Sequence, residues 1–223
     1  MGPIPERYSI FAPLYDALSG EFPIYRAGRV LGIAAMAPRV GDQVLDVGCG
    51  TGLNFPLLQA GIGETGTIVG LDSSADMLRQ AHRRATKRGW NNVILLQADA
   101  TTLDPAKVAA RITAAGGQDC SDAAIATYAL SLMPQWPRAW DNMRALCRRG
   151  AMLGVVDMQD PVGAAALFTP LARLACRLGG ADIAARPWQS VERDCTDVLR
   201  AAARGGHLQI RAGRSAKDAS EPS

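Results

Sequence analysis

Short apolar runs alternate with segments of helical periodicity through the middle of the chain. The apolar, β-branched runs predict buried strands over residues 43–48, 67–72, 93–99, 122–128 and 151–157. The segments between these runs predict helices over residues 53–62, 75–89, 105–115 and 138–149. Nearly continuous apolar strands that alternate with helices are typical of a parallel sheet covered on both faces. The pattern therefore predicts an α/β fold with a doubly wound, mostly parallel sheet.

Helical patterns flank this alternation on both sides. Residues 8–31 carry aromatic and apolar side chains at helical spacing, which predicts a helical N-terminal lid within residues 1–40. Residues 163–194 form a second amphipathic stretch, which predicts a helical insert that covers the substrate. We expect the main ligand-binding domain to span residues 41–216 and to include this insert.

The C-terminal part of the chain carries a hairpin signal. Residues 197–204 and 207–213 flank a Gly205-Gly206 pair. Because two glycines suit a two-residue primed turn, these segments predict a closing antiparallel hairpin, although the first of them could also extend a helix. The polar residues 217–223 predict a disordered tail.

The composition of the 223 residues is that of a globular protein. Hydrophobic residues make up 48% and charged residues 20%, which excludes wholesale disorder. No apolar run approaches the ~18 residues that a membrane-spanning helix needs. The five scattered cysteines lack CxxC spacing, and residues 1–10 lack a signal-peptide pattern. We therefore expect reduced thiols and a cytoplasmic location.

The charge distribution argues against one class of partner. The formal net charge of +3 is mildly basic and shows no concentrated basic stripe. A nucleic-acid-binding protein usually shows such a stripe or characteristic aromatic motifs. We expect no nucleic-acid partner, and the charge leaves the oligomeric state open.

A glycine-rich segment, VLDVGCGTGLNF at residues 44–55, carries the main candidate chemistry. The first predicted strand ends there in Gly48, Gly50 and Gly52, and a predicted helix follows. Glycines allow a sharp turn and a close approach of ligand to backbone, and the helix start offers free N–H groups. In open α/β sheets, ligands bind at this carboxyl edge of the strands. The segment therefore predicts a nucleotide-type ligand.

Carboxylates at the ends of the first three predicted strands narrow the choice of ligand. Asp72 could accept hydrogen bonds from both hydroxyls of a ribose, and Asp99 or its backbone could meet an adenine amino group. Asp46, beside the glycines, suits a cationic ligand better than a pyrophosphate. A dinucleotide fingerprint, G-x-G-x-x-G/A, does not accommodate Leu53. An NAD-linked oxidoreductase is therefore disfavoured.

The G-x-G-x-G spacing after the VLD strand resembles the class I S-adenosylmethionine-dependent methyltransferases, whose fold is Rossmann-like. The resemblance extends over residues 41–160, through IVGLDSSADML and NVILLQADAT. It implies that S-adenosylmethionine is the cofactor, with S-adenosylhomocysteine as its product. In this assignment Asp46 and the three glycines line the methionine part, Asp72 binds the ribose, Met77 lies against the adenine, and Asp99 binds its amino group. The remaining cofactor-binding residues that the resemblance implies are Asn54, Ser73, Ala100 and Tyr128.

Shorter matches resemble a particular subgroup. The Leu53-Asn54-Phe55-Pro56 loop, the Tyr15-Asp16 pair and the glycine hairpin are similar to quinone C-methyltransferases and bacterial phosphatidylethanolamine N-methyltransferases. This resemblance implies a small, hydrophobic or amphiphilic methyl acceptor such as a quinone, a lipid headgroup or a secondary metabolite. The alternative is a non-catalytic protein of the same fold that binds S-adenosylmethionine or another nucleotide.

Few residues offer themselves as a catalytic base. A hydroxyl or carbon acceptor needs a base, whereas a neutral amine needs only its lone pair. His82 lies on a basic helix face and His207 follows the glycine turn, so both favour structural or surface roles. Asp157 and Asp160 end the fifth predicted strand, where a base or cation-binding role competes with a capping role.

Two catalytic residues are predicted, Asp157 and Tyr15. Tyr15 follows from the Tyr-Asp pattern of the subgroup and is expected to touch the cofactor. No metal is expected, because the sequence shows no clear ligand set with histidine. The fourth strand is followed by neither an Asn-Pro-Pro-Tyr motif nor a Pro-Cys nucleophile, which argues against methylation of nucleic-acid bases or glutamine.

The insert also bears on the partner. It combines an apolar helix with basic residues and a tryptophan: Arg173, Arg177, Arg186, Trp188 and Arg193. Such a makeup is found on interfacial surfaces and equally on packing helices with snorkelling arginines. The expected partner is a small-molecule or lipid acceptor, and peripheral membrane contact stays open.

Overall fold

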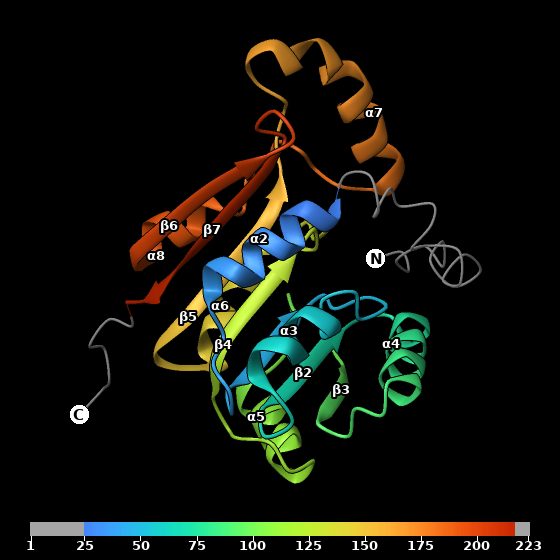
Figure 1. Ribbon diagram of the computed structural model, residues 1–223, viewed down its shortest axis with the longest axis vertical. Coiled ribbons are helices and arrows are strands. Elements are labelled where there is room, and N and C mark those ends of the chain that lie inside the picture. The colour runs from blue at the N-terminus through green and yellow to red at the C-terminus, as the bar shows by residue number, and fades with distance from the viewer. Residues whose placement is uncertain (1–24, 217–223) are drawn as a thin grey trace.

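The computed structural model describes residues 25–216 (Figure 1), and at positions 164, 168, 172, 175 and 177–179 it describes the backbone alone. The predicted lid residues 1–24, with Tyr15, and the predicted tail 217–223 lie outside the described residues. Across the described part, no helix combines the length and the apolar character needed to cross a bilayer.

Within residues 25–216, seven strands form one sheet in the order β3-β2-β1-β4-β5-β7-β6. Strands β1 to β5 are parallel, whereas β7 runs antiparallel to both β5 and β6. The prediction of a doubly wound, mostly parallel sheet with a C-terminal antiparallel hairpin is confirmed. The strands are β1 (Gln43–Val47), β2 (Thr67–Asp72), β3 (Val93–Gln97), β4 (Ser121–Thr127), β5 (Cys147–Met158), β6 (Cys195–Ala203) and β7 (Leu208–Ser215).

Helices connect the strands and cover both faces of the sheet (Figure 1). Ser74 caps one of them by accepting a hydrogen bond from the Met77 amide at 3.3 Å, and Asp104 caps another with Pro105 behind it. The helices are α2 (Arg26–Met36), α3 (Phe55–Ile62), α4 (Ala75–Lys87), α5 (Pro105–Ala114), η3 (Leu130–Leu132), α6 (Trp136–Ala145), η4 (Gly163–Phe168), α7 (Thr169–Gly179) and α8 (Gln189–Asp194).

The largest boundary error lies between α6 and β5. A helix was expected over residues 138–149, but α6 ends at Ala145 and β5 begins at Cys147. The start of β5 is irregular, since its register with β4 shifts between Ser121 and Ala123 and Gly150 has a φ of 72°. The start of β5 is polar and irregular, so it shows no alternation of apolar and polar residues. The predicted helix therefore extends too far toward the C-terminus.

Alternating strand residues point into two separate cores, which is why the strands read as continuous apolar runs. Leu45 faces a core that contains Trp140, while its neighbour Val44 faces the core that contains Phe55 and Ile33. All four strand residues flanking Asp46 in β1 are buried. Burial on both faces is expected for a parallel sheet sandwiched between helices.

The carboxyl ends of β1, β2, β4 and β5 meet at one edge, and α7 stands beyond that edge beside the β6–β7 turn (Figure 1). In that turn Gly205 and Gly206 have φ values of 63° and 75°, as a primed turn requires. The loop after α7 returns to the edge, where the Asp182 amide donates to the Ser131 carbonyl at 2.8 Å. The topology therefore places the strand ends that carry the predicted site residues along one edge of the sheet.

Candidate active site

The loop between β1 and α3 is shaped by three glycines with positive φ: 67° at Gly48, 53° at Gly50 and 76° at Gly52. A Cβ at Gly48 would lie 2.5 Å from the Cβ of Ala129, and one at Gly52 would lie 2.6 Å from the Phe55 ring. A Cβ at Gly50 would meet no described atom within 4 Å. Two glycines therefore serve close packing, while Gly50 turns an open stretch of backbone toward the edge.

Asp72 at the end of β2 fastens this loop. Its Oδ2 accepts a hydrogen bond from the Gly50 amide at 2.8 Å, and its Oδ1 accepts one from the Ser74 amide at 2.9 Å. Burial raises the pKa of this carboxyl above its usual value, and the backbone hydrogen bonds oppose that rise. Each carboxylate oxygen can accept a further hydrogen bond, so Asp72 can hold the loop and a ligand at once.

Asp46 is a fully buried carboxylate in the middle of the strand edge. Its Oδ1 accepts a hydrogen bond from Asn54 Nδ2 at 2.9 Å, while its Oδ2 has no hydrogen-bond partner among the described residues. Burial raises the pKa of Asp46 to about 7, against the opposing effects of the Asn54 hydrogen bond and the charge of Arg29. A buried oxygen without a partner is costly, so a cationic ligand at this position would compensate it.

Arg29 of α2, which is not part of the glycine motif, contacts the residues around Asp46. Its Nη1 donates to Asn54 Oδ1 at 3.1 Å and to Thr127 Oγ1 at 2.8 Å. Asn54 Nδ2 donates to the same hydroxyl at 2.9 Å, so the amide stands between the guanidinium on one side and Asp46 on the other. Sequence reasoning missed Arg29 and Thr127, because only the fold brings these residues to the glycine loop.

The second group of predicted residues lies at the ends of β2 and β3. Asp99 Oδ1 accepts hydrogen bonds from the Thr101 amide at 2.8 Å and the Thr101 hydroxyl at 2.7 Å. Met77 is buried in the first turn of α4, and Ser73 is exposed beside it. Ala100 is buried and its carbonyl accepts from Asn142 Nδ2 at 2.8 Å. The Ala98 amide bonds the Asp72 carbonyl at 3.0 Å, which joins the two strand ends.

Tyr128 follows β4 in a strained conformation, with a φ of 55°. Its hydroxyl donates to the Tyr25 carbonyl at 2.9 Å, and the two rings lie 4.8 Å apart between centroids. The Arg29 guanidinium carbon lies 5.2 Å from the centroid of the Tyr128 ring. Tyr128 therefore links the start of α2 to the strand edge.

Asp157, one of the two predicted catalytic residues, is fully buried near the end of β5. Its Oδ1 accepts hydrogen bonds from the Ser131 hydroxyl at 2.7 Å and the Met158 amide at 2.9 Å. Its Oδ2 accepts one from the Ser131 amide at 3.1 Å. Burial raises the pKa of Asp157 to about 6 against these bonds. The contacts bind Asp157 to η3, and a catalytic role stays a prediction.

The other titratable candidates are Asp160, His82 and His207. Asp160 is paired with Arg173 at 2.6 Å, which holds its pKa below the usual value. His82 lies exposed on α4, and His207 is buried with its Nδ1 2.6 Å from the Gln159 carbonyl oxygen. Within the described part of the chain, no group of three or more His, Cys, Asp or Glu side chains could hold a metal ion.

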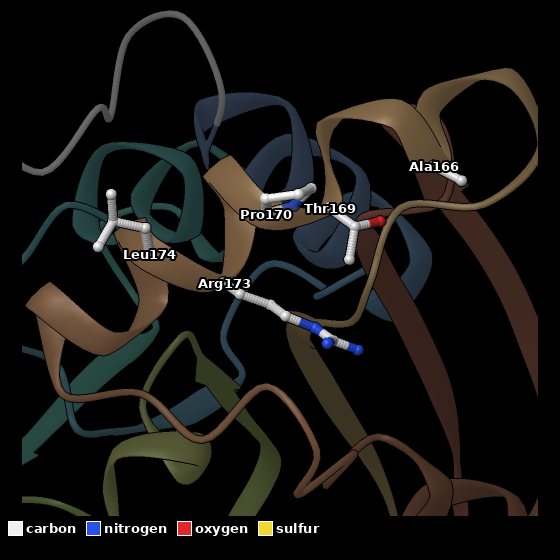
Figure 2. A pocket seen from close by; sticks show the side chains of 5 residues that line it. All are labelled: Ala166, Thr169, Pro170, Arg173 and Leu174. Carbon is white, nitrogen blue, oxygen red and sulfur yellow. The ribbon is translucent and has the colours of Figure 1, made fainter.

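A cavity of about 640 Å³ lies along the insert (Figure 2). Its lining residues all belong to η4 and α7: Ala166, Thr169, Pro170, Arg173 and Leu174. None of them is a predicted cofactor-binding residue. The cavity therefore belongs to the cover and is distinct from the glycine loop.

Comparison with protein families agrees with the geometry. The profile of a family described as a methyltransferase domain matches residues 44–150. This segment contains the glycine loop, Asp72, Asp99 and Tyr128, and it ends before the insert. The match therefore covers the strand edge with its candidate cofactor residues and leaves the cover outside.

Two relatives extend the similarity in sequence. The 2-phytyl-1,4-naphtoquinone methyltransferase of Synechococcus elongatus is 30% identical over 165 residues, which cover 73% of this chain and 64% of the relative. The phosphatidylethanolamine N-methyltransferase of Cereibacter sphaeroides is 31% identical over 142 residues, which cover 62% of this chain and 63% of the relative. The chain thus covers less than two thirds of the length of either relative.

A solved structure extends the similarity in fold. A SAM-dependent methyltransferase from Aquifex aeolicus superimposes with a TM-score of 0.59 at 15% identity. The match covers 92% of this chain and 98% of that one. At this identity the likeness concerns the fold, and it agrees with the strand order described above.

Proposed function

Because the chain belongs to the class I S-adenosylmethionine-dependent methyltransferases, we propose that it transfers a methyl group from this cofactor to a small, hydrophobic or amphiphilic acceptor. The single observation that carries the proposal is the buried Asp46 carboxylate, whose Oδ2 has no partner among the described residues, beside the open backbone of Gly50. Such an arrangement fits a ligand that brings positive charge to a glycine loop.

The residues at the strand edge fit the charges of the cofactor. S-adenosylmethionine supplies a methyl group on a sulfonium, and its methionine part carries an ammonium and a carboxylate. Asp46 offers a negative charge and Arg29 a positive one, held on opposite sides of the Asn54 amide. We assign the ammonium end to Asp46 and the carboxylate end to Arg29 and the glycine-loop amides, because opposite charges attract strongly where water is excluded.

We assign the nucleoside part of S-adenosylmethionine to residues at the ends of β2 and β3. Asp72 keeps acceptor capacity on both oxygens for two ribose hydroxyls, and its bond to Gly50 sets the distance between loop and carboxylate. Asp99 has no hydrogen bond to its Oδ2 among the described contacts, which leaves that oxygen for the adenine amino group. The buried Met77 and Ala100 supply apolar surface for the base.

Transfer from a sulfonium is an in-line displacement, so the chief task of the protein is to hold the acceptor atom in line with the methyl group. Ser131 and the loop at Asp182 lie over the strand edge and are tied to it through Asp157. We assign these groups to positioning the acceptor. Asp157 is also the candidate base for a hydroxyl or carbon acceptor, since a pKa near 6 suits proton acceptance close to neutral pH.

The acceptor class rests on the relatives and on the cover. One relative is named for a phytyl-naphtoquinone and the other for phosphatidylethanolamine, both molecules that join a polar head to long apolar chains. The cavity beside α7 is lined by apolar atoms of Ala166, Pro170 and Leu174 as well as by Arg173. These features favour an amphiphilic acceptor.

Formation of S-adenosylhomocysteine in the presence of quinone or aminolipid acceptors tests this function. Wild-type protein and Asp119→Ala, which changes an exposed carboxylate before β4 at the opposite edge, should form product equally. Asp72→Ala should form little product at the same cofactor concentration. No product with any acceptor, despite cofactor binding, would favour the alternative of a non-catalytic binding protein.

A further inference from the structure

The insert exposes an unusual amount of apolar surface. Leu167, Leu171 and Leu174 are 86%, 65% and 54% exposed, and we call them the leucine ridge. Val162, just before η4, is 55% exposed. Exposed apolar residues are common singly, but four large ones within residues 162–174 are a concentration that favours a surface for another apolar body.

The ridge follows from how α7 is anchored. Leu171 and Leu174 are three residues apart and share one face of the helix, whereas Cys176 lies on the opposite face. Cys176 is 3% exposed and its sulfur lies 3.7 Å from that of Met158 at the end of β5. Because the face of α7 that carries Cys176 packs against the end of β5, the face that carries Leu171 and Leu174 is turned outward.

Positive charge borders the ridge. Arg173 and Arg186 are exposed and both act on the single carboxylate of Asp160, while Arg204 is exposed in the β6–β7 turn. That turn lies against the insert, because the Val162 amide donates to the Gly205 carbonyl at 2.9 Å. Three arginines face two described aspartates, Asp160 and Asp182, so the rim carries a net positive charge.

We propose that the leucine ridge and its arginine rim form a docking surface for an anionic lipid bilayer. Amphipathic helices with an apolar face and basic flanks bind in the headgroup region, with a strength that follows the buried apolar area and the anionic charge. α7 lies beyond the carboxyl edge of the strands (Figure 1). The inference rests on the proposed function in one respect, namely that the methyl acceptor comes from the bilayer.

The cavity beside the ridge, which Leu174 itself lines, is consistent with this orientation. Figure 2 shows Arg173 and Leu174 projecting from the same helix beside Thr169 and Pro170, with Ala166 at the far end. The cavity thus joins an apolar side chain of the ridge to the polar groups of Thr169 and Arg173, which suits an amphiphilic ligand.

Co-sedimentation with vesicles tests the docking surface without cofactor or acceptor. The full chain is mixed with vesicles of phosphatidylcholine alone or of phosphatidylcholine with phosphatidylglycerol. We expect the chain to bind the anionic vesicles and to bind the neutral vesicles clearly more weakly. Leu167→Ser/Leu171→Ser/Leu174→Ser should bind at least about tenfold more weakly, since three apolar side chains no longer enter the bilayer.

Two further variants keep the test specific. Val40→Ser/Leu199→Ser removes apolar side chains that are 76% and 54% exposed away from the insert, and it should bind like wild type. Arg186→Gln/Arg204→Gln leaves the ridge intact and should lower binding to anionic vesicles only. If the triple-serine variant failed to fold, as judged by circular dichroism, the arginine variant would still decide the question.

Three results would overturn the inference. The first is a wild-type chain that binds neither vesicle, which would assign the ridge to another occupant such as residues 1–24. The second is a control variant that loses as much binding as the triple-serine variant. The third is a wild-type dimer that the serine substitutions convert to a monomer. Calorimetric binding of S-adenosylmethionine, measured on the same samples, separates a failure of the docking surface from a failure of the proposed function.

Discussion

The two regions at the carboxyl edge are built in opposite ways. Around the glycine loop, polar groups are buried and joined by hydrogen bonds, as between Asp72 and Gly50 or between Arg29 and Asn54. Around α7, by contrast, large apolar side chains are exposed and the ion pair of Arg173 with Asp160 is open to solvent. The first region suits one fixed, charged ligand, and the second suits a partner held by apolar area.

The buried charge of the glycine-loop region should cost stability when no ligand is present. The folded-state pKa of Asp46 is raised to about 7, so its stabilising contribution is complete below pH 3.8 and is lost as the pH rises through 7. Asp46→Asn should therefore raise the free energy of unfolding of the ligand-free protein at pH 8 by about 2–4 kcal/mol. The gain should shrink toward pH 5.

Thermal unfolding at pH 5 and pH 8 checks this prediction. The same variant should bind S-adenosylmethionine more weakly, because a neutral amide attracts a cation less than a carboxylate does. A variant that is less stable than wild type at pH 8 would show that Asp46 has a partner that stabilises its charge.

Loss of the second carboxylate should act on affinity instead. Asp72→Ala removes acceptors for two hydroxyls and also frees the Gly50 amide, so cofactor binding should weaken by about 1.5–3 kcal/mol. Calorimetric titration measures the change, with Asp119→Ala as the control for a carboxylate elsewhere. Unchanged affinity in Asp72→Ala would remove the assignment to the ribose.

Arg29 offers a sharper test of how the region recognises its ligand. Arg29→Ala should weaken binding of S-adenosylhomocysteine about tenfold, through loss of a charged hydrogen-bond donor. Binding of 5′-methylthioadenosine, which lacks the amino-acid part, should change little. Equal losses for both ligands would assign Arg29 to support of the loop through Asn54 and Thr127.

The smallest expected effect lies between the two regions, at Ser131. Ser131→Ala removes a hydrogen bond to Asp157 and should lower stability by about 1 kcal/mol. Because that bond lowers the pKa of Asp157, its loss should raise the pKa further above 6. If Asp157 is the base, the acidic limb of the kcat profile moves to higher pH, whereas a purely structural Asp157 leaves the limb in place.

Local sequence patterns were sufficient for the parts of the fold that are formed locally. The five parallel strands follow from apolar runs, and the end of β2 at Asp72 is confirmed. β3 is only partly buried and ends at Gln97, two residues before the predicted end at Asp99. The Gly205-Gly206 turn followed from glycine's access to positive φ. The irregular start of β5 was missed, because a register shift leaves no periodic signal.

Contacts between distant elements were beyond the reach of sequence reasoning. Arg29 and Asn54 are 25 positions apart, and Arg29 and Thr127 are 98 apart, so no spacing rule connects them. The bonds of Asp157 to Ser131 likewise depend on where η3 packs after β4. The outward face of α7 could be suspected from its composition, but its exposure became evident only once Cys176 was seen to face the sheet.

Calorimetric titration of the wild-type chain with S-adenosylmethionine and with S-adenosylhomocysteine tests the central claim most directly. Both ligands should bind with micromolar affinity, and binding of the cationic ligand should strengthen as the pH rises through 7 and Asp46 ionises. Absence of binding by either ligand across this pH range would contradict the assignment of the glycine loop, Asp46 and Asp72 to this cofactor.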